Sequence, residues 1–295
     1  MAFQIENGKL WRYSEEPGVT EVIVPEGVTE IGETAFQNCN TITSVVLPDS
    51  VKSISENAFV SCRVLTSITI PESVTSFGTF YSIYNNRNPI YAFEKVPWFD
   101  KFPGKLVIAG KNVLIRYSGT KKDIVIPEGC ERINDYAFYN RDKLVSLVIP
   151  NSVTEIGESA FCGCSSLKAV TMSENVTKIE DNTFNGCASL ESITIPKSVT
   201  SIGSDAFRDC RSLTSVTIAS SVTHIGSTTF SGCSALESIE VDPDNEHYAS
   251  IDGVLYDKDL YGIIHVPAKK TEITVPKNTG YIENEAFKGC FFLKA

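Results

Sequence analysis

The sequence predicts an α/β repeat solenoid, a right-handed coil of stacked 23-residue units with a parallel sheet, short helical turns and inserted β-hairpins. Three observations support this fold class. Phenylalanine recurs at intervals of 23 residues, cysteine follows most of these phenylalanines after three residues, and proline usually precedes them by eleven. A unit this short cannot bury its apolar side chains alone, so neighbouring units must stack and share one core. The repeated phenylalanines are Phe36, Phe59, Phe138, Phe161, Phe184, Phe207 and Phe230.

The first predicted element of each unit is a short strand. In the unit at 190–212, polar and β-branched apolar residues alternate over 192–195. This alternation predicts a strand with the side chains of Ile193 and Ile195 facing inward. Pro196 lacks a backbone N–H and therefore ends the strand. Equivalent strands of successive units are expected to lie ~4.8 Å apart in a parallel sheet.

The second half of the unit is predicted to return the chain to the core and to close the coil. Ile202 provides a second apolar corner, and Gly203 permits the turn that follows it. Apolar residues then recur at spacings of three and four, which favours a short helical turn with one apolar side. These residues are Ala206, Phe207, Cys210 and Leu213.

Three stretches interrupt the repeat, and each predicts a β-hairpin with glycine near its turn. The first is an N-terminal hairpin at 1–24, and the third is a hairpin insert at 242–275. The second lies at 79–126, where an irregular stretch rich in aromatic residues precedes the hairpin. With these inserts included, residues 1–295 are expected to form a single solenoid domain.

The repeated motif resembles the BspA-type leucine-rich repeat. It reads Leu-x-x-Ile-x-Ile-Pro-x-Ser-Val-Thr-x-Ile-Gly-x-x-Ala-Phe-x-x-Cys and recurs in register along almost the whole chain. The resemblance implies a horseshoe-like or gently curved leucine-rich repeat solenoid. It also implies a non-catalytic function in adhesion or protein binding, as part of a bacterial cell-surface or secreted protein.

An extracellular or cell-surface location rests on this resemblance alone. The sequence shows no signal peptide or anchor, so a cytoplasmic location stays open. The chain stops midway through a unit, at Phe291–Ala295, which favours a truncated piece of a longer protein. An uncapped edge of this kind is expected to promote end-to-end self-association. The alternative function is that of a scaffold or recognition fragment of a larger protein, and this class of larger proteins includes enzymes.

Composition and charge narrow the range of partners. The 26 basic and 36 acidic residues give a net charge of −10, which disfavours a nucleic-acid partner. No apolar run approaches the ~18 residues of a membrane span, so no membrane insertion is expected. A protein partner remains, and the resemblance makes a host extracellular or cell-surface protein one candidate.

The cysteines and histidines do not predict a reactive or metal-binding site. Seven of the nine cysteines hold the repeat position and are expected to be buried free thiols, whereas Cys162 is out of register and expected to be exposed. No Cys/His cluster has zinc-ligand spacing. The three histidines are His224, His247 and His265, and His224 holds a variable repeat position that predicts a solvated face. We therefore expect no catalytic site, no metal and no cofactor, and the chain is not expected to be an enzyme.

The outward positions of the predicted strands carry mostly small side chains, which would leave a flat sheet for an extended partner. The irregular segment would add the aromatic and arginine anchors that usually dominate binding energy. The candidate partner-binding residues on the sheet are Ser146, Thr171, Ser192, Thr194, Ser215 and Thr217, and those in the irregular segment are Tyr81, Tyr84 and Arg87.

Overall fold

The computed structural model describes residues 2–80, 90–91, 106–110, 112–117 and 119–294. The chain forms two compact units, Met1–Gly119 and Thr120–Ala295, and each is described by itself. The candidate anchors Tyr81, Tyr84 and Arg87, with most of the predicted aromatic insert, lie outside the described residues.

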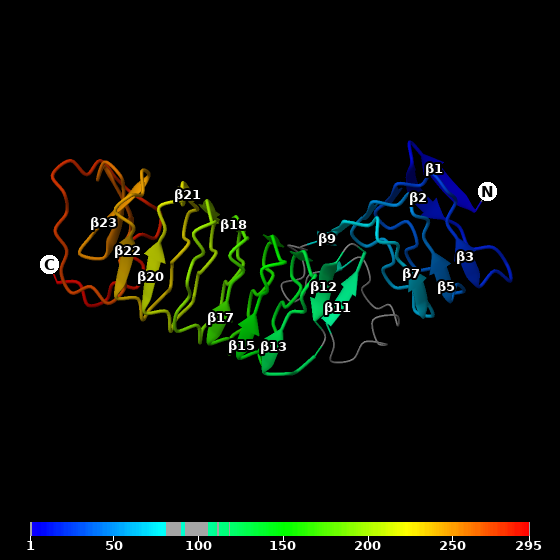
Figure 1. Cartoon of the computed structure of the whole chain (residues 1–295), viewed down its shortest axis with the longest axis horizontal. Coiled ribbons are helices and arrows are strands. Elements are labelled where there is room, and N and C mark those ends of the chain that lie inside the picture. The colour runs from blue at the N-terminus through cyan, green and yellow to red at the C-terminus, as the bar shows by residue number, and fades with distance from the viewer. Residues whose placement is uncertain (1, 81–89, 92–105, 111, 118, 295) are drawn as a thin grey trace. The chain divides into compact units, whose positions relative to one another are not determined.

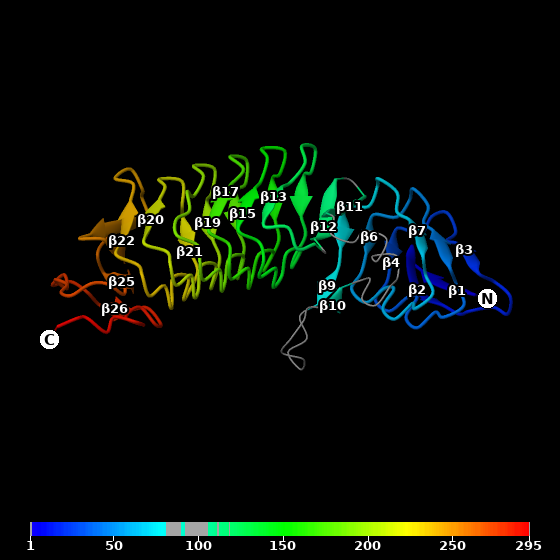
Figure 2. The ribbon, with the colours of Figure 1, turned by 90° about the horizontal axis from the view of Figure 1, so that it is seen from below.

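The first unit begins with an antiparallel hairpin of β1 (Phe3–Glu6) and β2 (Lys9–Tyr13). Its turn residues, Asn7 and Gly8, both have positive φ angles of 52° and 77°, which suits a tight hairpin turn. Parallel strands then stack on two faces of the coil (Figures 1 and 2). One face holds β3 (Glu21–Ile23), β5 (Ser44–Val46) and β7 (Ser67–Thr69), and the other holds β4 (Glu30–Ile31), β6 (Ser53–Ile54) and β8 (Ser76–Phe77).

Two further antiparallel pairs complete the strands of this unit. The first pair consists of β9 (Thr79–Phe80) and β10 (Ile90–Tyr91), and the second of β11 (Leu106–Ala109) and β12 (Val113–Tyr117). The second pair is a hairpin within the region where the sequence predicts one.

The second unit repeats the two-faced coil and then departs from it. One face holds β13 (Asp123–Val125), β15 (Ser146–Val148), β17 (Ala169–Thr171), β20 (Ser215–Ile218) and β22 (Ser238–Val241). The other holds β14 (Arg132–Ile133), β16 (Glu155–Ile156), β18 (Lys178–Ile179), β19 (Ser201–Ile202) and β21 (His224–Ile225). An insert of three antiparallel strands follows, made of β23 (Tyr248–Ile251), β24 (Val254–Asp257) and β25 (Gly262–His265), and β25 pairs in parallel with β26 (Tyr281–Ile282).

Strand pairing confirms the parallel sheets and the repeat of the sequence. Each paired residue faces its equivalent one unit later, as in Val22↔Val45 and Val45↔Ile68. The aromatic ladder is also present, because the rings of Phe184 and Phe207 stack with centroids 5.5 Å apart and planes 4° apart. The rings of Phe207 and Phe230 stack in the same way at 5.8 Å and 3°.

The predicted strand at 192–195 is wrong. Its side chains alternate as expected, with Ile193 and Ile195 buried, but residues 191–196 carry no strand. On this face the ladder runs from β13 to β17 and resumes only with the pair β20–β22. The side-chain alternation follows from burial of the isoleucines, whereas a strand also needs ladder hydrogen bonds to its neighbours, which this segment lacks.

The predicted short helical turns are also wrong, because none of the described residues is helical. The residues two before and two after each repeat phenylalanine have positive φ angles, for example 54° at Asp205 and 55° at Asp209 around Phe207. Left-handed residues so close together interrupt a right-handed helix. The Phe207 N–H instead donates to the Thr229 carbonyl of the next coil at 3.0 Å, while the Arg208 N–H donates locally to Asp205 at 3.0 Å. The closing turn therefore contributes its own hydrogen-bond ladder between coils.

Gly203 is required for a reason other than its backbone angles. Its φ lies outside the left-handed region, but a Cβ on it would lie 2.5 Å from the backbone nitrogen of Asp181 in the preceding coil. A side chain at this position would push two stacked coils apart.

All nine cysteines are free thiols. The repeat cysteines are buried, except for the half-buried Cys290. Five of the buried repeat cysteines donate a thiol hydrogen bond to the phenylalanine carbonyl of the preceding coil, as Cys210 does to Phe184 at 3.2 Å. They are Cys62, Cys164, Cys187, Cys210 and Cys233. Cys162 is half-buried, and burial raises its pKa to about 11, so it is not an activated thiol.

Candidate functional site

The strand face of the second unit carries the partner-binding residues predicted from the sequence. Ser215 and Thr217 are exposed on β20 and pair with Ser238 and Glu240 of β22. Thr171 is exposed at the end of β17. On this face the coil register therefore aligns the outward side chains in two columns.

The other three sheet residues differ in detail. Ser146 is half-buried, and its hydroxyl donates to the Asp123 carboxylate at 2.6 Å. Ser192 and Thr194 are exposed, but they lie in the segment that has no strand. The structure thus brings five of the six residues to an accessible surface and ties Ser146 to its neighbour.

The strand face is less uniformly polar than the sequence suggested. In the second unit, the first two outward side chains of one column are Val125 and Val148, which are 69% and 38% exposed. Ile23 and Val46 hold the equivalent positions in the first unit. In each unit the polar part of the face therefore begins with a small apolar edge.

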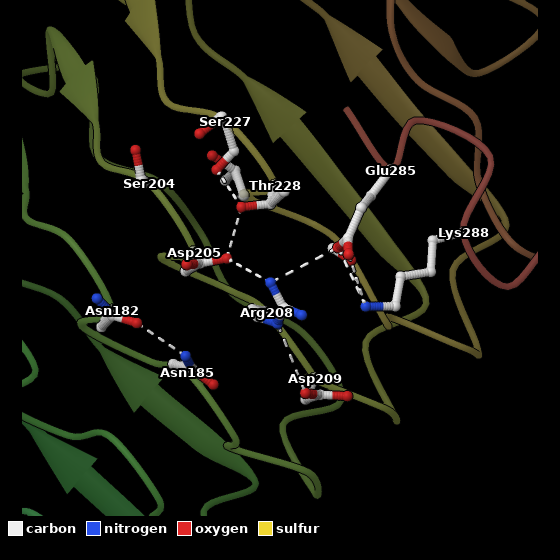
Figure 3. Close-up of polar contacts among 12 residues, drawn as sticks. Asn182, Asn185, Ser204, Asp205, Arg208, Asp209, Ser227, Thr228, Glu285 and Lys288 are labelled. Carbon is white, nitrogen blue, oxygen red and sulfur yellow. Dashed lines mark hydrogen bonds and ion pairs between the residues drawn. The ribbon is translucent and has the colours of Figure 1, made fainter. Parts of the chain in front are cut away.

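A polar network ties together coils that are far apart in the sequence (Figure 3). The Thr228 hydroxyl donates to the Asp205 carboxylate at 2.6 Å, and the Arg208 guanidinium reaches the same carboxylate at 3.1 Å. Arg208 also lies 3.6 Å from Glu285, whose carboxylate pairs with Lys288 at 3.1 Å as well. Glu285 thus fastens the coil after the insert to the coil before it.

Each charged side chain of this network lies close to a side chain of opposite charge. The hydrogen bond to Asp205 raises the pKa of the Arg208 guanidinium. A hydrogen bond from Ser231, followed by one from Lys288, lowers the pKa of the Glu285 carboxyl. These side chains are partly exposed, so solvent screens each ion pair and each one stabilises the fold little. Their role is to hold the end of one coil against another.

A cavity of about 380 Å³ lies next to this network, where the insert interrupts the repeat. The ladder of β18, β19 and β21 ends at β21, and the insert strands follow in place of a regular coil. The Tyr248 hydroxyl of the insert accepts the Ile225 backbone N–H of β21 at 2.8 Å. Ser227 and Thr228 line the cavity, so the network of Figure 3 forms part of its wall.

All three histidines of the chain line this one cavity. His224 is exposed on β21, as the sequence predicts, and His247 is exposed just before β23. His265 is only 5% exposed, and its ring lies 5.9 Å from that of Phe230, at the end of the phenylalanine stack. These residues are far apart in the sequence, and only the fold brings them together.

His265 is buried without a hydrogen-bond partner in the described part of the chain. Burial lowers the pKa of its imidazole to about 4, so the ring is neutral at pH 7. A neutral imidazole offers one donor and one acceptor. The ring lines the cavity, and its nitrogens are not among the fully buried polar atoms that lack a partner in the described residues, so they are open to a ligand in the cavity.

Two carboxylates and two phenols complete the polar lining. Asp257 accepts hydrogen bonds from the Tyr261 N–H at 2.7 Å and from the Tyr281 hydroxyl at 3.3 Å. Burial, followed by the charge of Asp257, raises the pKa of Tyr281, and the charge of Glu283 adds to this effect. Among the described residues that line the cavity, none is lysine or arginine. The cavity wall is therefore acidic.

Metal binding and membrane spanning can both be checked in the described part of the chain. No group of three or more His, Cys, Asp or Glu side chains is placed to hold a metal ion among these residues. No helix capable of crossing a membrane occurs among them either.

In the last described coil, which includes β26, several apolar side chains are exposed. Phe291 is 90% exposed, and Phe292 and Ile282 are also exposed. Self-association through this edge stays a prediction.

Comparison with known proteins identifies the repeat. A family model described as the BspA type leucine rich repeat region matches in six copies, over residues 12–94 and 116–247. The chain is also similar to a leucine rich cell surface protein from Faecalibacterium prausnitzii, at 35% sequence identity and a TM-score of 0.50. That match covers 76% of this chain and 60% of the other, so this chain spans less than two thirds of that protein's length.

Two further structures share the fold. A leucine-rich repeat protein from Eubacterium ventriosum matches at 24% identity and a TM-score of 0.54, over 61% of this chain and 51% of that one. One from Bacteroides ovatus matches at 24% identity and a TM-score of 0.50, over 99% of this chain and 78% of that one. A comparison with curated protein sequences finds no match. Because the family model covers more than half of the residues, the chain belongs to the BspA-type leucine-rich repeat family.

Proposed function

We propose that this chain is a non-catalytic binding solenoid of a bacterial surface protein, and that the strand face of its second unit holds an extended segment of a protein partner. The observation that carries the proposal is the alignment of the outward side chains in two columns, within β13, β15 and β17 and again within β20 and β22. A surface location is supported by the similar F. prausnitzii protein, which is described as a leucine rich cell surface protein.

The chemistry of this face suits an extended polypeptide. Val125 and Val148 offer apolar surface at one end, and Thr171, Thr194 and Thr217 continue the same column with hydroxyl groups. Small side chains let a partner backbone approach closely, and threonine hydroxyls both donate and accept hydrogen bonds. The apolar end is therefore the expected anchor, and the polar part sets the register of the bound segment.

The test begins with peptides that bind the chain, selected from a random-peptide display library. Hydrogen exchange of the complex should show added protection at β13, β15, β17 and β20. The variant Thr194→Arg with Thr217→Arg places two long cations on the face and should weaken binding at least about tenfold, ~1.4 kcal/mol. The control is Thr154→Arg with Thr177→Arg, two exposed threonines near the opposite strand face, which should bind normally.

The outcome that contradicts the proposal is equally specific. If the selected peptides protect the opposite strand face, or if both double variants bind them equally well, the site on this strand face is wrong. An unchanged melting temperature in both variants would show that the comparison reports binding and not unfolding.

A further inference from the structure

We propose that the cavity between β21 and the insert binds the guanidinium group of an arginine side chain, presented by a peptide or protein. This site is separate from the proposed strand face, and neither proposal depends on the other. Its volume of about 380 Å³ falls in the ~300–1,000 Å³ range of ligand pockets.

The unpartnered imidazole of His265 is the first reason to expect a ligand. His265 is 5% exposed and lines the cavity, with no hydrogen-bond partner among the described residues. A neutral ring in this position presents an acceptor nitrogen to a ligand N–H, and guanidinium carries five N–H donors in a planar fork.

The charge of the wall determines the class of ligand. Asp257 and Glu283 both line the cavity, and the described side chains form no ion pair with either of them. The cations of the adjoining network, Arg208 and Lys288, are already paired with Asp205 and Glu285 (Figure 3). An anionic ligand would be repelled, and a neutral ligand would leave two carboxylates without a counter-charge. A cation compensates both.

The two tyrosines favour guanidinium within the class of cations. Tyr248 is bound to the Ile225 N–H through its oxygen, and Tyr281 donates to Asp257, so both rings are fixed at the cavity. Guanidinium stacks on aromatic faces and is more weakly hydrated than an ammonium group. It can therefore enter a half-enclosed site at a smaller desolvation cost than the ammonium group of lysine.

Binding of a ligand in the cavity can be measured through the NMR signals of the histidines. With the side chains isotopically labelled, the chain gives imidazole NMR signals from only three histidines, all of which line the cavity. Titration with Nα-acetyl-arginine methylamide should shift these signals saturably. The corresponding lysine compound should bind more weakly. The citrulline compound has the same shape as arginine but no charge, and it should cause no shift.

Two variants locate the site. Glu283→Gln keeps the size of a side chain that has no hydrogen bond in the described structure, and it should weaken arginine binding at least about tenfold, ~1.4 kcal/mol. His265→Phe preserves a ring against Phe230 and should also weaken binding. Glu237→Gln removes the same charge from an exposed position away from the cavity and should change nothing.

Several results would overturn the assignment. Equal binding of the citrulline and arginine compounds would show that charge is not recognised. Histidine shifts with glucose or galactose but not with arginine would show that the cavity takes a neutral hydroxylated ligand. A flat titration up to the solubility limit of the arginine compound would show that the cavity does not bind this group. Circular dichroism and the melting temperature of each variant separate loss of binding from loss of fold.

Discussion

Replacement of Phe207 by alanine tests whether stacked side chains hold the second unit together. The side chain is fully buried and its ring stacks on Phe184 at 5.5 Å and on Phe230 at 5.8 Å. Removal of a buried phenylalanine costs ~3–5 kcal/mol through lost burial and the cavity left behind. Each aromatic pair adds ~0.5–1.5 kcal/mol beyond its buried area. We therefore place the loss for Phe207→Ala in the upper part of the burial range.

The expected loss is local as well as large. Coils of a solenoid contact only their neighbours, so destabilisation should begin in the coils that hold Phe184 and Phe230. Hydrogen exchange followed by mass spectrometry should show faster exchange at 180–232, with β13 and β15 nearly unchanged. Phe207→Leu keeps most of the volume but loses both ring contacts, so it should cost clearly less than the alanine variant. Arg211→Ala, at an exposed position of the same coil, should cost under about 0.5 kcal/mol.

The reasoning would be refuted by a Phe207→Ala protein that exchanges uniformly faster along the whole second unit, or by equal losses for the alanine and leucine variants. The first result would mean that the unit unfolds as one cooperative body. The second would mean that filling the space left by the ring does not matter, which contradicts the cost assigned to the cavity.

Two further predictions follow from buried groups. If Cys210 acts as a hydrogen-bond donor to Phe184, Cys210→Ser should be more stable in urea than Cys210→Ala, which should lose ~1–3 kcal/mol; the reverse order would show that the thiol is only an apolar filler. Burial lowers the pKa of His265 to about 4 from 6.5, so the unfolded chain binds its proton first and stability present above pH 6.5 is lost as the pH falls toward 4. The loss from this residue is ~3 kcal/mol, and urea unfolding at pH 7 and pH 4.5 should show a smaller acid loss in His265→Phe. An unchanged acid loss in that variant would assign the destabilisation to other groups.

Much of the fold was predictable because each structural position of the coil occurs many times in the sequence, once in every unit. A single phenylalanine says little, but phenylalanines at a constant interval can share an environment only if the coils stack in register. The inward strand residues and the buried cysteines follow from the same repetition. Their environments are set by the residue one unit earlier and one unit later, which the sequence shows.

The closing turn was not predictable from the apolar pattern. Apolar residues at spacings of three and four are consistent with a helix, but they are equally consistent with a turn that folds back twice. The signal that was present lies in the residues around Phe207. Asp205 and Asp209 belong to a class of residues that tolerates left-handed angles, and glycine or asparagine holds the equivalent of Asp209 in most other units. Read at a fixed place in every unit, these residues mark left-handed positions that a helix would not accept.

The cavity was the least predictable feature, because it lies where the insert replaces a regular coil and no equivalent residues occur in other units. His224 lies in a regular coil, His247 comes before the first insert strand and His265 ends the last one, so no sequence spacing relates them. Two of these positions are explained by exposure, but His265 is not. The ring of His265 packs against Phe230 at 5.9 Å with a tilt of 55°, where the preceding phenylalanines of the unit stack on one another. A phenylalanine at this position would keep a ring against Phe230 without a buried polar group. The imidazole is destabilising by comparison, and that cost at the edge of an acidic cavity is what directs attention to a ligand.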